Sequence, residues 1–180
     1  MTDERVCISE LGQDASADHA GPGHIDLEAV EGGARLCVHR FEPGRCDRGA
    51  DHLSGVPLQE FKDAFAGTEP YFYMLWFYVA DEDQVEFDAW YRNEHAPRLL
   101  ALSSWRRITL FGDVQQGGAS SEPARFSIHR LADTAAVGTP EHERARDTNW
   151  RRSLSSRPWY PRTRRGTYRV VDADTLRWQP

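Results

Sequence analysis

The segment FDAWYRNEHAP, which begins at Phe87, places aromatic rings, a carboxylate and an imidazole on successive helical turns. Phe87, Tyr91 and His95 are four residues apart, so they form one stripe on a predicted helix, with Trp90 and Glu94 beside it. If this stripe faces the interior, desolvation favours a neutral His95 imidazole, which can act as a general base near pH 7. The alternative is a structural histidine near the end of a helix, hydrogen-bonded to a backbone carbonyl.

A second imidazole, His142, follows a predicted helix start. Thr139 is a typical N-cap and Pro140 a typical first helical residue, and the pattern predicts a helix to about Leu154. His142 then lies in the first turn, where the helix dipole disfavours imidazolium and lowers its pKa. Such a group suits a base or a hydrogen-bond donor to a substrate oxygen. The alternative is a solvent-exposed histidine at a helix start.

Several other chemistries have no sequence signature here. Nucleotide-binding loops of the G-x-G-x-x-G or G-x-x-x-x-G-K-[ST] type, H-E-x-x-H and G-x-S-x-G are all absent. A metal site could be built from distant residues such as His95, His142 and a carboxylate, but no spacing encodes one. We therefore predict no metal and no cofactor.

The composition is that of a globular protein of one domain and a tail. The 180 residues are 39% hydrophobic and 11% aromatic, and the net charge of -6 argues against a nucleic-acid partner. Arginines nevertheless crowd residues 144–169. They form either a solvated surface or a binding face for an anionic ligand or an acidic partner.

Cysteine usage and the N-terminal sequence favour a reducing compartment. Cys7, Cys37 and Cys46 include no Cys-x-x-Cys pair, and the first residues lack the features of a signal peptide. No run approaches the roughly 20 apolar residues of a membrane span. We predict a cytoplasmic protein with free thiols and no membrane partner.

Residues 1–70 are predicted to be an N-terminal extension. Residues 12–33 have the Gly-, Ala-, Asp- and Ser-rich composition of a mobile segment. Residues 6–11 and 35–41 are predicted to be short strands, and residues 58–65 a short amphipathic helix.

Residues 71–172 show a regular alternation of elements, followed by a tail at residues 173–180. Strands are predicted at residues 71–79, 106–111, 125–131 and 166–171, with helices at 84–102 and 139–154. The order β-α-β-β-α-β is the ferredoxin-like motif, an α+β fold with an antiparallel sheet and both helices on one face.

The alternation of side chains predicts which face the helices cover. One parity contains Ile108, Leu110, Phe126, Ile128, Tyr168 and Val170 and is expected beneath the helices. The other parity, which includes His129, is mixed, and the first strand is apolar on both faces. We therefore predict a C2 homodimer in which two sheets face each other, with His129 at the dimer contact.

The run F-x-x-W-Y-x-x-E-H-x-P-x-L-L that begins at Phe87, followed by Trp105 and an arginine-containing strand, resembles the dimeric α/β-barrel superfamily and, within it, the EthD-like proteins. The segments TPEH at 139–142 and TNWRR at 148–152 are similar to the second helix of those proteins. His142 departs from the aromatic residue common there and is similar to the His-Pro-x-His helix start of a plant polyketide cyclase. The resemblance covers residues 71–172.

This resemblance implies a small hydrophobic pocket between helices and sheet. Members include cofactor-free monooxygenases and cyclases acting on polyketides, enzymes of aromatic degradation, and proteins of unassigned role; some distant relatives use haem. We therefore predict a cofactor-independent biosynthetic enzyme for a small hydrophobic, aromatic or polyketide-like substrate. In it His95 or His142 moves a proton, while the other histidine and Tyr91 polarise a carbonyl or stabilise an enolate. The predicted substrate-binding residues are Phe87, Trp90, Asn149, Trp150, Ile128 and Leu110.

The reaction is predicted to be a cyclisation, a dehydration or a related lyase or isomerase step. Two alternatives remain open at this point. A cofactor-free monooxygenase would let the same carbanion meet oxygen, and a non-catalytic accessory protein would use the pocket only to bind a ligand.

Overall fold

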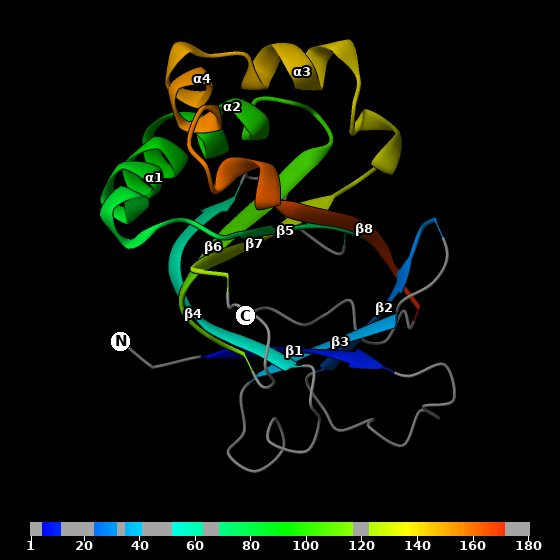
Figure 1. Ribbon diagram of the computed structural model, residues 1–180. Helices are drawn as coiled ribbons and strands as arrows, with labels where there is room; N and C mark the ends of the chain where they lie inside the picture. The colour runs from blue at the N-terminus through cyan, green and yellow to red at the C-terminus, as the bar shows by residue number, and fades with distance from the viewer. Residues whose placement is uncertain are drawn as a thin grey trace.

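Eight strands close into one barrel within a single chain, as Figure 1 shows. The computed structural model describes residues 5–11, 24–31, 35–40, 52–62, 69–116 and 123–171. The strand order around the barrel is β1-β3-β2-β8-β5-β7-β6-β4, and every neighbouring pair is antiparallel. The strands are β1 (Val6–Leu11), β2 (His24–Ala29), β3 (Arg35–Arg40), β4 (His52–Lys62), β5 (Tyr71–Phe77), β6 (Trp105–Gln116), β7 (Arg125–Leu131) and β8 (Arg164–Val170).

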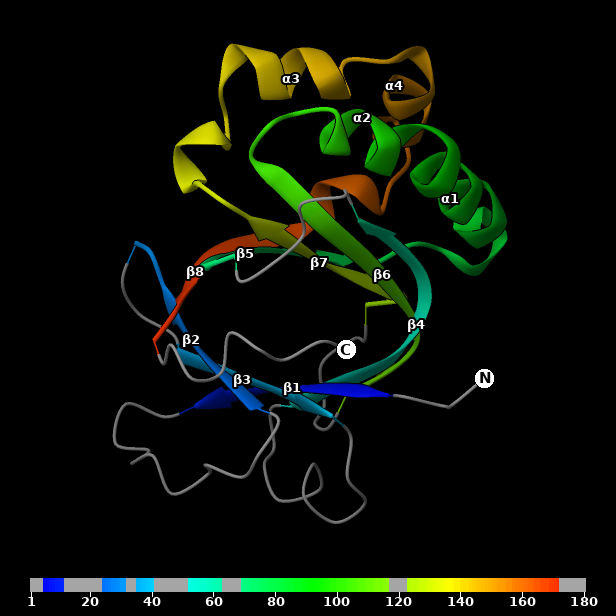
Figure 2. The same cartoon turned by 180° about the vertical axis from the view of Figure 1, so that it is seen from behind.

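The second half of the chain confirms the predicted ferredoxin-like α+β fold. All four predicted strands are found, as β5, β6, β7 and β8, with helices after β5 and after β7. Seen from both sides, these helices cover one face of the sheet (Figures 1 and 2). They are α1 (Gln84–Trp90), α2 (Ala96–Leu100), α3 (Pro140–Arg146) and α4 (Asn149–Ser155).

The N-terminal strands lie across the barrel from the helices, where we expected a second copy of the chain. β4 pairs with β6 and β2 pairs with β8, so β1 to β4 close the sheet that the second half leaves open. The chain thus covers with its own residues the face that led us to predict a homodimer. The homodimer itself stays a prediction.

Two expectations for the N-terminal region are wrong. Residues 58–62, predicted to begin a helix, belong to β4, because long-range pairing with β6 outweighs the local helical pattern. Residues 24–29, predicted to be mobile, form β2, and its Ile25 and Leu27 side chains are buried in the barrel. The predicted strands 6–11 and 35–41 are found as β1 and β3. Residues 12–23, 32–34, 41, 63–65 and 172–180 lie outside the described residues.

The barrel separates two apolar cores. One lies between the helices and the sheet and contains Phe87, Trp90 and Tyr91; the other fills the barrel and contains Phe72, Met74 and their neighbours. β5 contributes large side chains to both cores, as its sequence predicted for a strand covered on both faces.

The predicted facing of β6 is correct, and that of β7 and β8 is wrong. Tyr168 and Val170 of β8, which were also predicted beneath the helices, pack in the barrel. Ile108 and Leu110 of β6 lie beneath the helices, but Phe126 and Ile128 of β7 point into the barrel. The register explains the difference, since Ile108 is opposite His129 and Leu110 is opposite Ser127, and residues in opposite positions share a face. His129 therefore faces the helices and does not lie on the face predicted for a dimer contact.

Three further features bear on the remaining expectations. Among the described residues, no helix is long and apolar enough to cross a membrane. Cys7 and Cys37 are buried, and Cys46 lies outside the described residues. The cytoplasmic location stays a prediction.

Gly55 offers a test of the placement of β4. A Cβ atom at this position would stand 2.5 Å from the Phe126 ring and 3.2 Å from the Gly112 carbonyl oxygen. The Phe126 ring is fully buried and stacks on Phe111 at 4.4 Å, so it has little room to move. We expect Gly55→Ala to lower the free energy of unfolding by about 1–3 kcal/mol through overpacking, measured by urea denaturation.

Val85→Ala is the matched control, because the Val85 side chain is 81% exposed and its truncation should change stability by less than about 0.5 kcal/mol. Equal stability of Gly55→Ala and the wild type would contradict this placement of β4.

Candidate functional site

A fully buried histidine, His129, is held between the first helix and the sheet by three polar side chains. The Trp105 indole N–H donates to Nδ1 of His129 at 3.1 Å, and the Tyr91 hydroxyl lies 2.7 Å from Nε2. The Ser127 hydroxyl lies 3.1 Å from the same Nε2. An indole can only donate, so Nδ1 is an acceptor and a neutral ring carries its proton on Nε2. Burial lowers the pKa of His129 to about 3, and the imidazole is neutral.

His95 lies beside this group but has no hydrogen-bond partner among the described residues. Its ring stacks on Trp90 at 4.4 Å and lies 5.1 Å from the Tyr91 ring, and only 8% of the residue is exposed. Burial holds the pKa of His95 well below its usual value of 6.5, and the positive charge of Arg146 lowers it further. His95 is thus a neutral imidazole whose ring nitrogens are open to a ligand.

The backbone around His95 departs from a regular α-helix. Between α1 and α2, residues Tyr91–His95 form a π-helical turn, in which the N–H of Ala96 bonds to the carbonyl of Tyr91, five residues earlier. Pro97 follows at once and has no N–H to continue the α-helical pattern. Turns of this kind are frequent at functional sites.

Glu94 ties the first helix to the last one. Its Oε1 accepts hydrogen bonds from the Trp90 indole at 3.1 Å and from the Thr148 hydroxyl at 2.5 Å. Thr148 also caps α4 by accepting from the N–H of Arg151. The single helix predicted for residues 139–154 is therefore wrong: it breaks at Asp147, whose backbone is not helical, and a second helix begins.

His142 lies in the first turn of α3, as predicted, and is buried. Its Nδ1 accepts a hydrogen bond from the N–H of Gly138 at 2.9 Å, so the neutral ring carries its proton on Nε2. The ring stacks on Trp105 at 4.8 Å. Burial and the charge of Arg146 lower the pKa of His142 to about 4. The pKa of His142 is lowered as predicted, but the causes are burial and the charge of Arg146.

Two adjoining cavities lie at these histidines. The inner cavity has a volume of about 20 Å³, enough for about one water molecule, and lies between the helices and the sheet. The outer cleft, of about 350 Å³, opens beside it between α3, β5 and β8. His142, Tyr73, Arg146 and Arg165 line both spaces. The hydrophobic pocket implied by the resemblance is thus nearly filled, and the larger space lies at its side.

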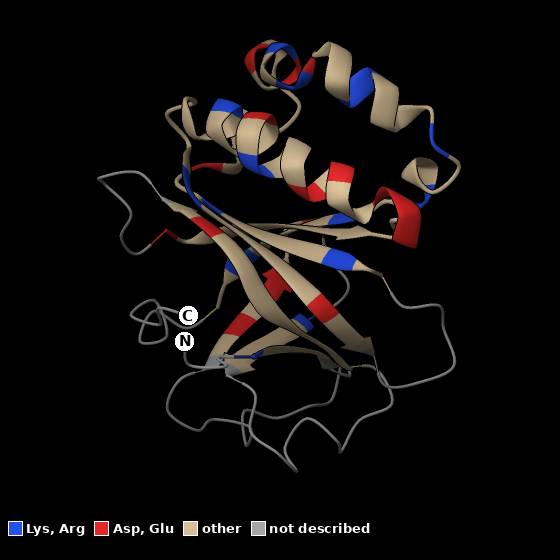
Figure 3. Ribbon diagram, turned by 90° about the vertical axis from the view of Figure 1, so that its left-hand side faces the viewer, with Lys and Arg blue, Asp and Glu red and all other residues tan. Residues whose placement is uncertain are grey.

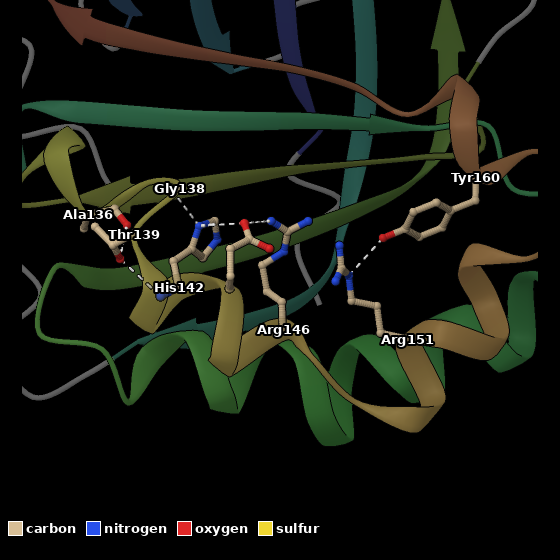
Figure 4. A network of polar contacts seen from close by, with 8 residues as sticks. Ala136, Gly138, Thr139, His142, Arg146, Arg151 and Tyr160 are labelled. Carbon is tan, nitrogen blue, oxygen red and sulfur yellow. Dashed lines mark hydrogen bonds and ion pairs between the residues drawn. The ribbon is translucent and has the colours of Figure 1, made fainter.

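Arginines approach the histidines from α3, α4 and β8. In Figure 4, Arg146 and Arg151 extend in the same direction from their helices. The Arg146 side chain is 11% exposed and pairs with Glu143 at 2.9 Å, whereas Arg151 donates to the Tyr160 hydroxyl at 3.1 Å. Positive charge thus surrounds the neutral imidazoles.

The structure brings together only part of the predicted site. Trp90, His95 and His142 line the inner cavity, whereas the Tyr91 hydroxyl is engaged with His129 and lines neither space. The other predicted substrate-binding residues also line neither space. Phe87 and Leu110 are fully buried in the helix-side core, Ile128 faces the barrel, Trp150 packs against the core, and Asn149 is exposed and accepts from Arg152.

The residues of the site that were not predicted from the sequence include His129, Tyr73, Arg146 and Arg165. His129 and Tyr73 could have been found from strand register, since His129 is opposite Tyr73 on β5 and Ile108 on β6. The two arginines lie within the arginine-rich segment, but no spacing distinguishes them from their neighbours. Among the residues that the structure describes, no three His, Cys, Asp or Glu side chains gather as metal ligands.

No family model matches the sequence, and no curated protein matches it significantly. Solved structures match the fold over nearly the whole chain. An uncharacterized ferredoxin-fold protein related to antibiotic biosynthesis monooxygenases, from Listeria monocytogenes 4b F2365, is 11% identical, with a TM-score of 0.58 over 94% of this chain and 95% of that one. An anthrone oxidase-like protein is 13% identical, with a TM-score of 0.61 over 94% and 92% of the two chains.

A heme-degrading enzyme from Listeria monocytogenes is 12% identical, with a TM-score of 0.54 over 92% of this chain and 99% of that one. These likenesses show that the chain has the ferredoxin-like fold predicted from its sequence. They also extend over the N-terminal strands, which the sequence resemblance did not reach.

The three neutral histidines predict a loss of stability in acid. Each has a folded-state pKa below its unfolded value of 6.5, so below that pH the unfolded chain binds protons that the folded chain does not. The free energy of unfolding is unaffected above about pH 6.5 and falls as the pH drops below it, by about 2 kcal/mol per histidine at about pH 5.

Urea denaturation at about pH 7 and pH 5 measures this loss. His142→Gln removes one of the three groups, so its stability should fall by about a third less than that of the wild type over the same interval. If the two proteins lose equal stability, His142 is not held neutral in the fold.

Proposed function

We propose that this chain is a cofactor-independent tailoring enzyme that transfers a proton on a small aromatic or polyketide-like substrate. The observation that carries this proposal is the His95 imidazole, which is buried, neutral and without a hydrogen-bond partner among the described residues, at the wall of a cavity. Buried polar groups are normally hydrogen-bonded, so an open one at a cavity suits a ligand.

The neighbouring groups suggest distinct roles for the two histidines. His95 accepts the proton from the substrate, because both of its ring nitrogens are open. His142 donates a hydrogen bond through Nε2–H to a substrate oxygen, because its Nδ1 is already bound by Gly138. Tyr91 and His129 hold the wall beside His95 and act as positioning residues.

A histidine with a lowered pKa is a weak base, so the anion formed on the substrate must be stabilised. The guanidinium groups of Arg146 and Arg165 line the same spaces as the histidines and supply positive charge. Charge that is already in place where a substrate anion develops lowers the barrier to forming it. An enolate or phenolate held in the outer cleft fits this arrangement.

The size of the two spaces limits how the substrate can be placed. A ring fits the outer cleft, whose volume lies near the lower end for small-molecule sites. The inner cavity admits only one small group, such as a hydroxyl or carbonyl oxygen. The porphyrin of haem is far too large for the inner cavity beside His95.

The anion can then cyclise, eliminate water or isomerise. A second candidate is a cofactor-free monooxygenase, in which the same anion reacts with oxygen. The likeness to an anthrone oxidase-like protein and to a protein related to antibiotic biosynthesis monooxygenases favours this candidate. The remaining alternative is a protein that binds a ligand in this cleft without catalysing a reaction.

Anthrone, a tricyclic ketone with an acidic methylene group, is a suitable first probe. Without oxygen, the wild type in deuterated buffer should exchange the methylene protons faster than buffer alone, as followed by proton NMR. His95→Ala should slow this exchange by about 10²- to 10⁴-fold while the circular dichroism spectrum is kept. His52→Ala is the matched control, because His52 lies on β4 and lines neither space.

Repeating the experiment in air, with an oxygen electrode, separates the candidates. Oxygen uptake that needs His95 supports the monooxygenase, and exchange without uptake supports the proton-transfer enzyme. Full activity of both His95→Ala and His142→Ala would show that the assignment is wrong. Binding of anthrone and other aromatic C–H acids without any turnover would support the non-catalytic protein.

A further inference from the structure

The arginine-rich segment of the chain is largely neutralised by its own surroundings. Figure 3 shows acidic and basic residues interspersed over the helices. Arginines 144, 146, 152, 157 and 169 pair with carboxylates, Arg151 bonds to a hydroxyl, and Arg162 and Arg164 lie over aromatic rings. Arg165 is the exception, with no hydrogen bond, ion pair or ring contact among the described residues.

Arg165 lies where it can meet a ligand. It lines both the inner cavity and the outer cleft, together with Arg146. The inner cavity has no carboxylate among its described lining residues, and its three histidines are neutral. Arg146 is paired with Glu143, so the guanidinium group of Arg165 supplies the uncompensated positive charge. Positive charge in a confined space favours an anionic ligand.

The outer rim limits the charge of that anion. Glu31 and Glu143 line the outer cleft but not the inner cavity, so the rim carries as many carboxylates as guanidinium groups. Glu143 also occupies one side of Arg146. A monoanion at the inner end meets both arginines, whereas a dianion that extends to the rim would be repelled.

The walls of the outer cleft accept a flat apolar body. They include Tyr73, Val137 and Gly166, and the Tyr168 side chain lies against Gly166, where a Cβ atom would stand 2.7 Å from the Tyr168 hydroxyl. Carboxylates are the monoanions that guanidinium groups bind most directly, through paired hydrogen bonds.

We propose that the ligand of this site is a small aromatic monocarboxylate, whose carboxylate is bound by Arg165 and Arg146 while its ring lies in the outer cleft against Tyr73. As the substrate class of the enzyme, this inference rests on the proposed function; as a binding property, it can be tested without turnover.

The test compares three probes with the same naphthalene ring: 2-naphthoate, the neutral 2-naphthamide of nearly the same shape, and the dianionic 2-naphthyl phosphate. Their binding to the full chain is measured by calorimetry or by tryptophan fluorescence. The wild type should bind naphthoate most tightly. Arg165→Gln should weaken naphthoate binding by about ten- to hundredfold and leave naphthamide binding unchanged.

Arg164→Gln is the matched control, because Arg164 adjoins Arg165 on β8, stacks over Trp76 and lines neither space. It should bind naphthoate as the wild type does. Arg146→Gln gives a second measurement if Arg165→Gln fails to fold, and thermal unfolding of each variant shows whether it folds.

Equal affinity for naphthoate and naphthamide, equal weakening of both by Arg165→Gln, or no binding of naphthoate would overturn the proposal. Tighter binding of naphthyl phosphate through the same arginines would also overturn it, in favour of a dianion site. If naphthoate binding depends on charge but anthrone protons do not exchange, the result supports this inference and argues against the proposed function. If anthrone protons exchange but naphthoate is not preferred, the result supports the proposed function and argues against this inference.

Discussion

A sheet with large apolar side chains on both faces needs two apolar covers, and this chain supplies both. On β5, Tyr73 and Leu75 enter the core beneath the helices, while Phe72 and Met74 enter the barrel. The helices after β5 and β7 form the first cover, and the closure of β1 to β4 forms the second. Because burial of apolar surface is the main favourable term in folding, this closure determines which face of each strand the site receives.

The closure also explains why polar groups lie beneath the helices. With Phe126 and Ile128 of β7 committed to the barrel, Ser127 and His129 must face α1 and the π-helical turn. A buried imidazole needs hydrogen-bond partners for its ring nitrogens, and Trp105 and Tyr91 are those partners for His129. These hydrogen-bonded side chains lie beside the His95 ring, which has no hydrogen-bond partner of its own among the described residues. The position of the candidate site therefore follows from which side chains of the sheet face the barrel and which face the helices.

The sequence was most informative where structure is local. The strands of residues 71–171 and the helix start at Thr139 could be read from alternation, capping residues and proline position. The stripe of Phe87, Tyr91 and His95 was correctly expected to face inward, because a helix fixes the relation between residues one turn apart.

What could not be read depends on partners far away in the chain. The segment that forms β4 has a helical pattern of its own, and only pairing with β6 makes it a strand. The facing of β7 follows from register, and a shift of one residue exchanges its two faces. The break before α4 depends on Thr148 reaching Glu94, 54 residues earlier. Arg165 became a candidate only when the partners of its neighbours were known.

The two halves of this barrel are unequal, because the described part of residues 5–62 contains strands and no helix. In a symmetric pair of identical subunits, every pocket occurs twice, and any change in the sequence alters both copies. A barrel closed by one chain escapes this duplication. Its helix-covered chamber is not repeated among the described N-terminal strands, so a substitution in one half of this barrel has no counterpart in the other half.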